Sequence, residues 1–193
     1  MVNKKLDDIN QLWTSDITYY NLGEILYYIV LIMDIYSRKI IGLSVADNMK
    51  ADNNCQALEM AFKTRKQNHF TNLIYHSDRG GQYVSDSYTN MLTKAIIKIS
   101  MCNEVYENSH IERVNETIKN QYLRYWKITR FKELEYQLKQ TIDAYNNGKP
   151  HSSLLKMTPG SFEQYIKELG DDKRPNYQFG QQMKQKMLIQ INV

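Results

Sequence analysis

Residues 12–45 have the sequence LWTSDITYYNLGEILYYIVLIMDIYSRKIIGLSV, and this stretch decides the fold because it predicts three β-strands joined by short turns. Polar and apolar side chains alternate along residues 12–20, as in a strand with one buried face. Residues 26–35 are almost continuously apolar, which is typical of a central strand covered on both faces. Residues 39–45 are rich in branched apolar side chains. We therefore expect three antiparallel strands in a meander.

The spacing of apolar residues changes after this meander. Helical spacing predicts one helix over residues 51–66, with Asp52 as its N-cap, and another around residues 87–94. Short strands are expected at residues 73–76 and 96–100. Strands that alternate with helices favour parallel pairing. The sequence therefore predicts an α/β fold, with a five-stranded mixed sheet flanked by helices.

The second half of the chain is predicted to be mostly helical. Apolar residues recur every three to four positions along residues 107–126 and 131–146, which indicates two amphipathic helices. Thr158 and Pro159 are expected to begin a short helix that extends to about residue 169, with Thr158 as its N-cap and Pro159 at the first helical position.

The composition is that of an ordinary globular protein, with 42% hydrophobic and 24% charged residues in a chain of 193. The net charge of +4 permits a nucleic-acid partner but does not by itself argue for one. No apolar run is long and uncharged enough to span a bilayer, so we expect no membrane partner. Cys55 and Cys102 lie far apart in the sequence and suggest no disulfide framework, so a reducing cytoplasm is expected.

Three acidic residues occupy positions where a mixed sheet gathers functional groups. Asp16 lies on the polar face of the first strand, Asp78 ends the fourth strand, and Glu112 lies one turn into the helix after the fifth. A carboxylate inside a strand is costly without a partner, and a divalent cation held by several carboxylates is such a partner. The spacing equally allows Asp16 to accept a hydrogen bond from a neighbouring strand and Asp78 to be only a turn residue.

The helix that carries Glu112 has a second polar stripe. Asn108, Glu112, Glu116 and Lys119 are spaced so that they share one face of the helix. A metal-binding carboxylate and a lysine two turns further along suit contacts to adjacent phosphates. A solvated helix face with an ion pair explains the same pattern, so the spacing alone leaves both interpretations open.

Five segments, in order, resemble motifs of integrase-core (DDE) transposases from bacterial insertion sequences, which are relatives of retroviral integrase. The match runs from about residue 10 to residue 162. The segments are WTSDITY at 13–19, MDIYSRKIIG at 33–42, HSDRGGQY at 76–83, NSHIER at 108–113, and a final group made of YN at 145–146, KPHSSL at 149–154, TP at 158–159 and Phe162.

This resemblance implies an RNase H-like fold and a catalytic role for three acids. Asp16, Asp78 and Glu112 match the family's acidic triad, whose members are both the catalytic residues and the metal ligands. The resemblance implies Mg²⁺ or Mn²⁺ as cofactor, with two ions in the active complex. It excludes Asp34, whose position in the family is not a ligand. Because three clustered carboxylates repel one another, at least one should have a raised pKa when no cation is bound.

The same resemblance implies DNA as the partner, both the ends of the mobile element and the target. Lys119, seven residues beyond Glu112, is a candidate contact to the DNA end, and Arg79, Asn108 and Arg113 are further candidates. A homodimer or higher oligomer is expected, located in the cytoplasm with the nucleoid. Relatives carry an N-terminal helix-turn-helix region, so we also expect a separate end-binding region or protein.

The expected elements and the resemblance together divide the chain into four parts. Within the last part, residues 170–183 are polar and are expected to be loosely held, whereas residues 188–193 suit a small terminal strand. The parts are an N-terminal extension (1–11), an integrase-like catalytic core (12–128), a C-terminal helical part of the core (129–169) and a polar tail (170–193).

Two other functions compete with an active strand-transfer core. The first is a non-catalytic DNA-binding or dimerisation module descended from such an enzyme, which the intact triad argues against. The second is an RNase H-type nuclease acting on RNA–DNA hybrids, which shares the metal chemistry but does not fit the motifs after Glu112. Metal-dependent nicking of DNA would separate the first of these from an active core.

Overall fold

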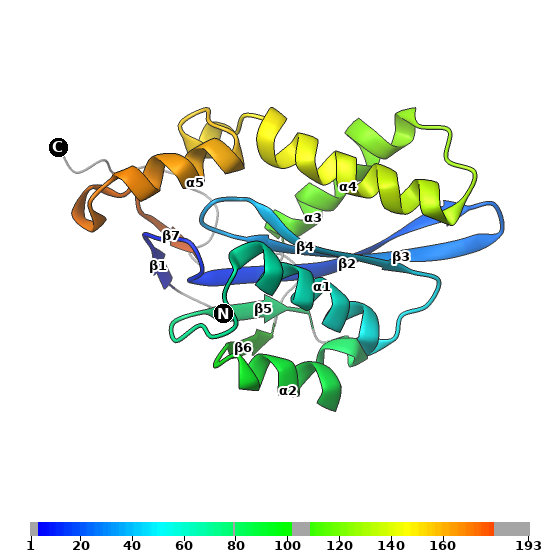
Figure 1. Cartoon of the computed structure of the whole chain (residues 1–193), viewed down its shortest axis with the longest axis horizontal. Coiled ribbons are helices and arrows are strands. Elements are labelled where there is room, and N and C mark those ends of the chain that lie inside the picture. The colour runs from blue at the N-terminus through cyan, green and yellow to red at the C-terminus, as the bar shows by residue number, and fades with distance from the viewer. Residues whose placement is uncertain (1–3, 79, 102–108, 180–193) are drawn as a thin grey trace.

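The computed structural model of the chain describes residues 4–78, 80–101 and 109–179. Its centre is a five-stranded sheet in the order β4-β3-β2-β5-β6. Figure 1 shows this sheet with helices on both sides. The five strands are β2 (Leu12–Leu22), β3 (Ile25–Asp34), β4 (Ile40–Ala46), β5 (Ile74–Ser77) and β6 (Lys98–Met101). The five-stranded mixed sheet predicted from the sequence is confirmed.

The pairing of the strands also follows the prediction. Strands β2, β3 and β4 form the antiparallel meander, with Trp13 opposite Asp34 at one end of the first hairpin and Leu22 opposite Ile25 at the other. Strand β5 pairs in parallel with β2, and β6 pairs in parallel with β5. The long hairpin of β2 and β3 therefore forms the centre of the sheet, and β5 lies beside only the first part of β2.

The two faces of the sheet are covered by different helices. Helices α1 (Ala51–Arg65) and α2 (Asp86–Lys94) cover one face, and α3 (Ser109–Thr117), α4 (Phe131–Gly148) and α5 (Pro159–Glu168) cover the other (Figure 1). Alternate residues of β3 serve the two cores, because side chains of a strand point to opposite faces. Ile29 and Leu31 pack under α3–α5, whereas Val30 and Ile32 pack under α1 and α2.

Two helix boundaries differ from the sequence-based expectation. The N-cap of α1 is Lys50 rather than Asp52. Asp52 lies inside the first turn, where its negative charge interacts favourably with the positive end of the helix dipole. The helix expected over residues 107–126 is α-helical only to Thr117 and continues as a π turn (Ile118–Tyr122) and a 3-10 turn (Leu123–Tyr125). The spacing of apolar residues cannot distinguish π and 3-10 turns from an α-helix, because each of these conformations places residues three to four positions apart on the same buried side.

The start of α5 was predicted correctly. Pro159 begins the helix, and the N–H of Ser161 donates to the Thr158 hydroxyl (3.1 Å), so Thr158 is the N-cap. Among the described residues, no helix is both long and apolar enough to cross a membrane.

A second, two-stranded sheet joins the two ends of the described chain. Strand β1 (Lys4–Leu6) pairs antiparallel with β7 (Tyr177–Phe179). A short 3-10 turn at Asp171–Lys173 precedes β7 in the sequence. The Tyr177 ring stacks on Tyr36 at 5.6 Å between ring centroids. The expectation that residues 170–183 are loosely held is therefore wrong for residues 171–179. The expected strand at 188–193 lies outside the described residues.

Candidate active site

The register of the sheet places Asp16 and Asp78 beside each other. Strands β2 and β5 run parallel with Thr14 opposite His76, and both acids lie two residues further along their strands. Asp78 directly follows β5, and its Oδ1 accepts a hydrogen bond from the Gly80 N–H (3.1 Å), which holds the turn after the strand. Asp78 is exposed and Asp16 is partly buried. Both acids thus lie where β5 ends beside the middle of β2.

Helix α3 brings the third acid to the same place. The amide Nδ2 of Asn115, a buried residue of α3, donates to Asp16 Oδ2 (2.7 Å). Glu112 lies three residues before Asn115, hence about one turn away on a neighbouring part of the helix surface, and it is exposed. Asn115 was not among the residues predicted from the sequence. Its only signal was its spacing of three from Glu112, which many helical residues share.

The electrostatics of Asp16 include contributions from both other acids. The pKa of Asp16 is raised to about 6, mainly by burial and also by the negative charges of Asp78 and Glu112, whereas hydrogen bonds from the Ile17 backbone and Asn115 lower it. The pKa of Glu112 is also raised, first by partial burial and then by the charge of Glu116. The expected rise in pKa is confirmed, although burial contributes more to it than repulsion between the carboxylates.

The donor atoms at this place are carboxylate oxygens, which are the ligands that hard divalent cations prefer. Within residues 4–78, 80–101 and 109–179, however, no three Asp, Glu, His or Cys side chains lie close enough together to hold one metal ion. The residue types therefore fit Mg²⁺ or Mn²⁺, and joint coordination by Asp16, Asp78 and Glu112 requires their carboxylates to approach one another further.

Of the four predicted DNA contacts, Lys119 and Arg113 lie within the described residues, and Lys119 contacts the strand that carries Asp16. Its ammonium group is 3.4 Å from the Thr18 hydroxyl and 4.6 Å from the centre of the Tyr19 ring. Thr18 is two residues from Asp16 on β2, so a positive charge lies along the same strand as the acid. Arg113 is exposed on α3. Arg79 and Asn108 lie outside the described residues.

A layer of buried tyrosines supports the strand that carries Asp16. The Ser15 hydroxyl and the Tyr83 hydroxyl share a hydrogen bond (3.0 Å), and the rings of Tyr83 and Tyr75 both pack against Tyr88. Burial raises the pKa of Tyr83 well above its usual value, so the ring is neutral. Tyr83 follows Asp78 in a short 3-10 turn and therefore ties the turn after β5 to β2. Sequence reasoning had no signal for this contact.

Asp34 lies in a separate group of charges. Arg65 of α1 bridges Asp34 Oδ2 (2.8 Å) and Glu163 Oε1 (2.7 Å), and all three side chains are at most 5% exposed. Lys39 Nζ and the Ser37 hydroxyl also donate to Glu163, at 2.9 Å and 2.7 Å. We call these five residues the buried charge network. They join the end of β3 to α1 and α5, which agrees with the exclusion of Asp34 from the acidic site.

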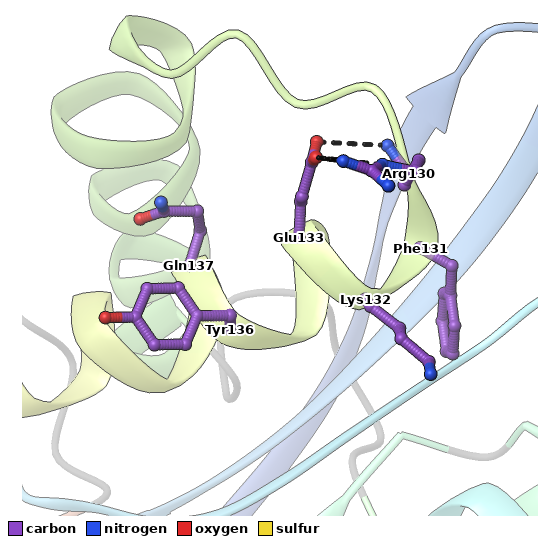
Figure 2. Close-up of a pocket in the computed structure, with 6 residues that line it drawn as sticks. All are labelled: Arg130, Phe131, Lys132, Glu133, Tyr136 and Gln137. Carbon is purple, nitrogen blue, oxygen red and sulfur yellow. Dashed lines mark hydrogen bonds and ion pairs between the residues drawn. The ribbon is translucent and has the colours of Figure 1, made fainter.

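An open pocket lies at the first turns of α4, away from the acids. It is lined by Arg130, Phe131, Lys132, Glu133, Tyr136 and Gln137. Figure 2 shows the Arg130 guanidinium turned back onto Glu133, with which it forms an ion pair (3.0 Å). The pocket contains none of the residues predicted as catalytic or DNA-binding.

Comparison with protein families identifies the class to which this fold and this acidic site belong. A model described as integrase core domain matches residues 8–105, and a second model with the same description matches residues 97–159. The first match alone covers half of the chain, and the chain therefore belongs to the integrase core domain family.

The chain is also similar to curated proteins of bacterial insertion sequences. Transposase InsF for insertion sequence IS3A of Escherichia coli K12 is 32% identical over 157 residues, which cover 80% of this chain and 54% of InsF. The insertion element IS600 uncharacterized 31 kDa protein of Shigella sonnei is 30% identical over 158 residues, covering 80% of this chain and 57% of that protein. The chain spans about half the length of these curated relatives.

Solved structures confirm the fold. The catalytic core domain of HTLV-2 integrase, in complex with magnesium, superposes with a TM-score of 0.65 at 17% identity, covering 81% of this chain and 97% of that core. A chain of the simian T-cell lymphotropic virus intasome gives a TM-score of 0.70 at 15% identity, covering 83% and 56%. The fold is therefore the RNase H-like fold of retroviral integrase cores, as the sequence motifs implied.

Proposed function

We propose that this chain is the catalytic core of a DNA transposase, a polynucleotidyl transferase that cuts DNA at the end of a mobile element and joins the freed 3′-hydroxyl to target DNA. One observation carries this proposal. Asp16 lies at the centre of the sheet, beside the end of β5 that Asp78 follows, and it accepts a hydrogen bond from Asn115 of α3, the helix that carries Glu112. Membership of the integrase core domain family supports the same conclusion.

In this proposal Asp16, Asp78 and Glu112 hold divalent ions, Mg²⁺ or Mn²⁺, with two ions in the active complex. Such ions, when bound, stabilise the attacking and leaving oxygens of phosphodiester transfer. Asn115 fixes the orientation of Asp16 through its hydrogen bond of 2.7 Å. Lys119, beside Thr18, offers a positive charge to a phosphate of the DNA end. The magnesium in the HTLV-2 integrase core supports the choice of cation.

The remaining proposals concern partners and organisation. We propose that the partners are the element's ends and target DNA, that the chain works as a dimer or higher oligomer in the cytoplasm with the nucleoid, and that a separate region or protein recognises the ends. We also keep the division into a catalytic core at 12–128 and a helical completion at 129–169, because α4 and α5 pack on the same face of the sheet as α3.

A strand-transfer assay tests the proposal. The protein is incubated with Mg²⁺ or Mn²⁺ and with labelled DNA that carries the terminal repeats of its own element. We expect nicked ends and joined products that EDTA abolishes. DNA binding without nicking in any metal would instead indicate a non-catalytic module. Cleavage of RNA–DNA hybrids with no joined DNA product would indicate an RNase H-type nuclease.

A further inference from the structure

One segment of the chain is strongly basic, and it starts beside the acidic site. Between Glu116 and Glu133 the sequence contains five basic residues and no acidic one. Lys119 contacts β2 near Asp16, and the segment then leaves the sheet through the π and 3-10 turns before α4 begins. The basic residues are Lys119, Arg124, Lys127, Arg130 and Lys132.

Two large aromatic side chains lie on the surface in the middle of this segment. Tyr125 is 77% exposed and Trp126 is 52% exposed. Their neighbours in the sequence, Arg124 and Lys127, are both exposed as well. Adjacent exposed rings between two cations are unusual on a protein surface without a binding role, because their apolar area remains in contact with water.

The backbone around the rings is held firmly, so their exposure does not reflect a loose segment. The Trp126 N–H donates to the Leu123 carbonyl (3.1 Å), and the Trp126 carbonyl accepts from the Ile128 N–H (3.1 Å). Leu123 is 1% exposed in the core under α3–α5, and Ile128 packs against the same core. The two aromatic rings are therefore presented to solvent from a fixed position.

The neighbouring pocket on α4 is a weaker candidate for a binding site. The charge of Arg130 is already neutralised by Glu133, as the dashed contacts in Figure 2 show. Phe131 stacks on Tyr27 at 5.0 Å between ring centroids and so belongs to the fold. No ion pair is assigned to Arg124 or Lys127 among the described residues, so their charges remain available to an anionic partner.

We propose that Arg124, Tyr125, Trp126 and Lys127 form a binding site for single-stranded DNA. Bases stack on the two rings, and the flanking cations contact phosphates, which is the combination that single-stranded nucleic acid requires. A neutral or basic protein partner does not need cations on both sides of the rings. The identity of this single strand rests on the proposed function. The basic segment begins at Lys119, the candidate contact to the DNA end, so we infer that the ligand is the unpaired strand beside the cut end of the element.

Tryptophan fluorescence tests this site without any catalysis. The chain has two tryptophans, and Trp13 is fully buried, so quenching by DNA reports on Trp126. In EDTA buffer, a 20-nucleotide single strand is titrated into the protein. We expect the single strand to quench Trp126 more strongly than a blunt duplex of the same sequence. Trp126→Phe removes that quenching, while the Trp13 signal shows that the fold is intact.

Binding by fluorescence anisotropy measures the contribution of each part of the site. We expect Tyr125→Ala/Trp126→Ala to weaken binding of the single strand by about tenfold or more, since stacking on aromatic side chains has that value per base. Tyr136→Ala is the matched control, because Tyr136 is 59% exposed on the neighbouring α4. It should leave the affinity unchanged.

The salt dependence tests the two cations. Arg124→Ala/Lys127→Ala should reduce the slope of log affinity against log salt by about 0.7 per lost phosphate contact. Lys63→Ala/Lys66→Ala removes the same charge at the end of α1, on the opposite face of the sheet, and should leave the slope unchanged. An equal change in both double variants would show a general charge effect and would overturn the site.

Three further outcomes would overturn the proposal. These are DNA binding that leaves Trp126 unquenched, no binding of the single strand at all, and a Tyr125→Ala/Trp126→Ala protein that binds DNA normally but sediments as a smaller oligomer. The last result would assign the rings to contact with a second copy of the chain. Because these assays contain no metal, a failed strand-transfer assay with intact quenching would count against the proposed function alone.

Discussion

The molecule contains two groups of carboxylates that look alike in the sequence and differ in the structure. In the acidic site, the described residues that donate hydrogen bonds to Asp16 are neutral groups, the Ile17 backbone and Asn115, and the negative charges of Asp78 and Glu112 act on it. In the buried charge network, Asp34 and Glu163 share the guanidinium of Arg65. Asp34 is the more deeply buried of the two aspartates. Burial alone therefore does not distinguish the two groups, whereas an ion pair with a buried cation, as in the network, does.

The two groups should respond in opposite ways to the same kind of change. Removing a charge from the acidic site should remove activity and leave the fold intact, because the raised pKa of Asp16 means that its charged form is the less favourable one in the folded state. Removing a charge from the network should destabilise the fold, because its partner remains buried without compensation. The following predictions use this contrast, from the largest effect to the smallest.

The largest effect is expected on strand transfer. Asp16→Asn, Asp78→Asn and Glu112→Gln keep the side-chain size and remove one charge each. If the three acids act as one unit, each change should reduce strand transfer on the order of 10³-fold or more, and combining them should cost little beyond that. The measurement is the joining of labelled element ends to target DNA, at equal concentrations of folded protein.

Asp34→Asn is the matched control for these variants, since it removes the same charge from the network. Its folded fraction should retain strand transfer, and all three site variants should still bind DNA. Activity that survives in a site variant and is lost in folded Asp34→Asn would show that the catalytic aspartate is Asp34.

A large effect on stability is expected at Arg65. Arg65→Met leaves Asp34 and Glu163 buried beside each other without their shared cation, and such a loss costs about 3–5 kcal/mol. Urea denaturation should show this as a lower midpoint with an unchanged slope. Arg113→Met, at an exposed position on α3, should change the stability by less than about 0.5 kcal/mol. Equal midpoints for Arg65→Met and wild type would show that the network does not stabilise the fold.

A smaller effect concerns the dependence of stability on pH. The folded-state pKa of Asp16 is raised to about 6, so the folded state binds its proton more tightly than the unfolded state does. The contribution of Asp16 to the free energy of unfolding should therefore fall by about 1–3 kcal/mol as the pH rises from about 4 to about 6. Asp16→Asn should remove that fall.

Glu163 of the network should contribute with the opposite sign. Burial alone would raise the pKa of Glu163, but Arg65, Lys39 and Ser37 lower it below the usual value. Its contribution is therefore present above the unfolded-state pKa and is lost as the pH falls through the lower folded-state pKa. Urea midpoints of wild type and Asp16→Asn, measured between pH 3 and pH 7, separate the two contributions. Parallel curves for the two proteins across pH 4–6 would contradict the raised pKa of Asp16.

The smallest effect is expected at Lys119. Lys119→Ala removes one phosphate contact, so the slope of log affinity against log salt for duplex DNA should change by about 0.9. Loss of the contact with the Tyr19 ring should cost only about 0.5–1 kcal/mol of stability. Anisotropy titrations at several salt concentrations measure the slope. If the slope does not change, Lys119 serves only to cover Tyr19 and Thr18.

The sheet and the three acids were predictable because they depend on local patterns. Alternation along residues 12–20 placed Asp16 on the polar face of a strand, and the end of the next parallel strand placed Asp78. The motif resemblance then linked both to Glu112. Each step used residues close together in the sequence, for which the period of a strand or helix determines the facing side.

The hydrogen-bond and ion-pair partners of the acids were not predictable in the same way. Arg65 and Glu163 are 98 residues apart, and Asp16 and Asn115 are 99 residues apart. No local period connects such positions, because their contact depends on how α1, α3 and α5 cross the sheet. The sequence analysis excluded Asp34 only through the resemblance, and the physical reason, its pairing with Arg65, comes from the structure.

Paramagnetic broadening by Mn²⁺ tests the central contrast most directly. In a ¹H–¹⁵N spectrum of the assigned protein, added Mn²⁺ should broaden the amide signals of Asp16, Asp78 and Glu112 first. The signals of Asp34 and Glu163 should persist, because Arg65 already neutralises those acids. In Asp16→Asn/Asp78→Asn the selective broadening should disappear. Broadening centred on Asp34 and Glu163, or spread evenly over the protein at millimolar Mn²⁺, would contradict the assignment of Asp16, Asp78 and Glu112 as the metal-binding acids.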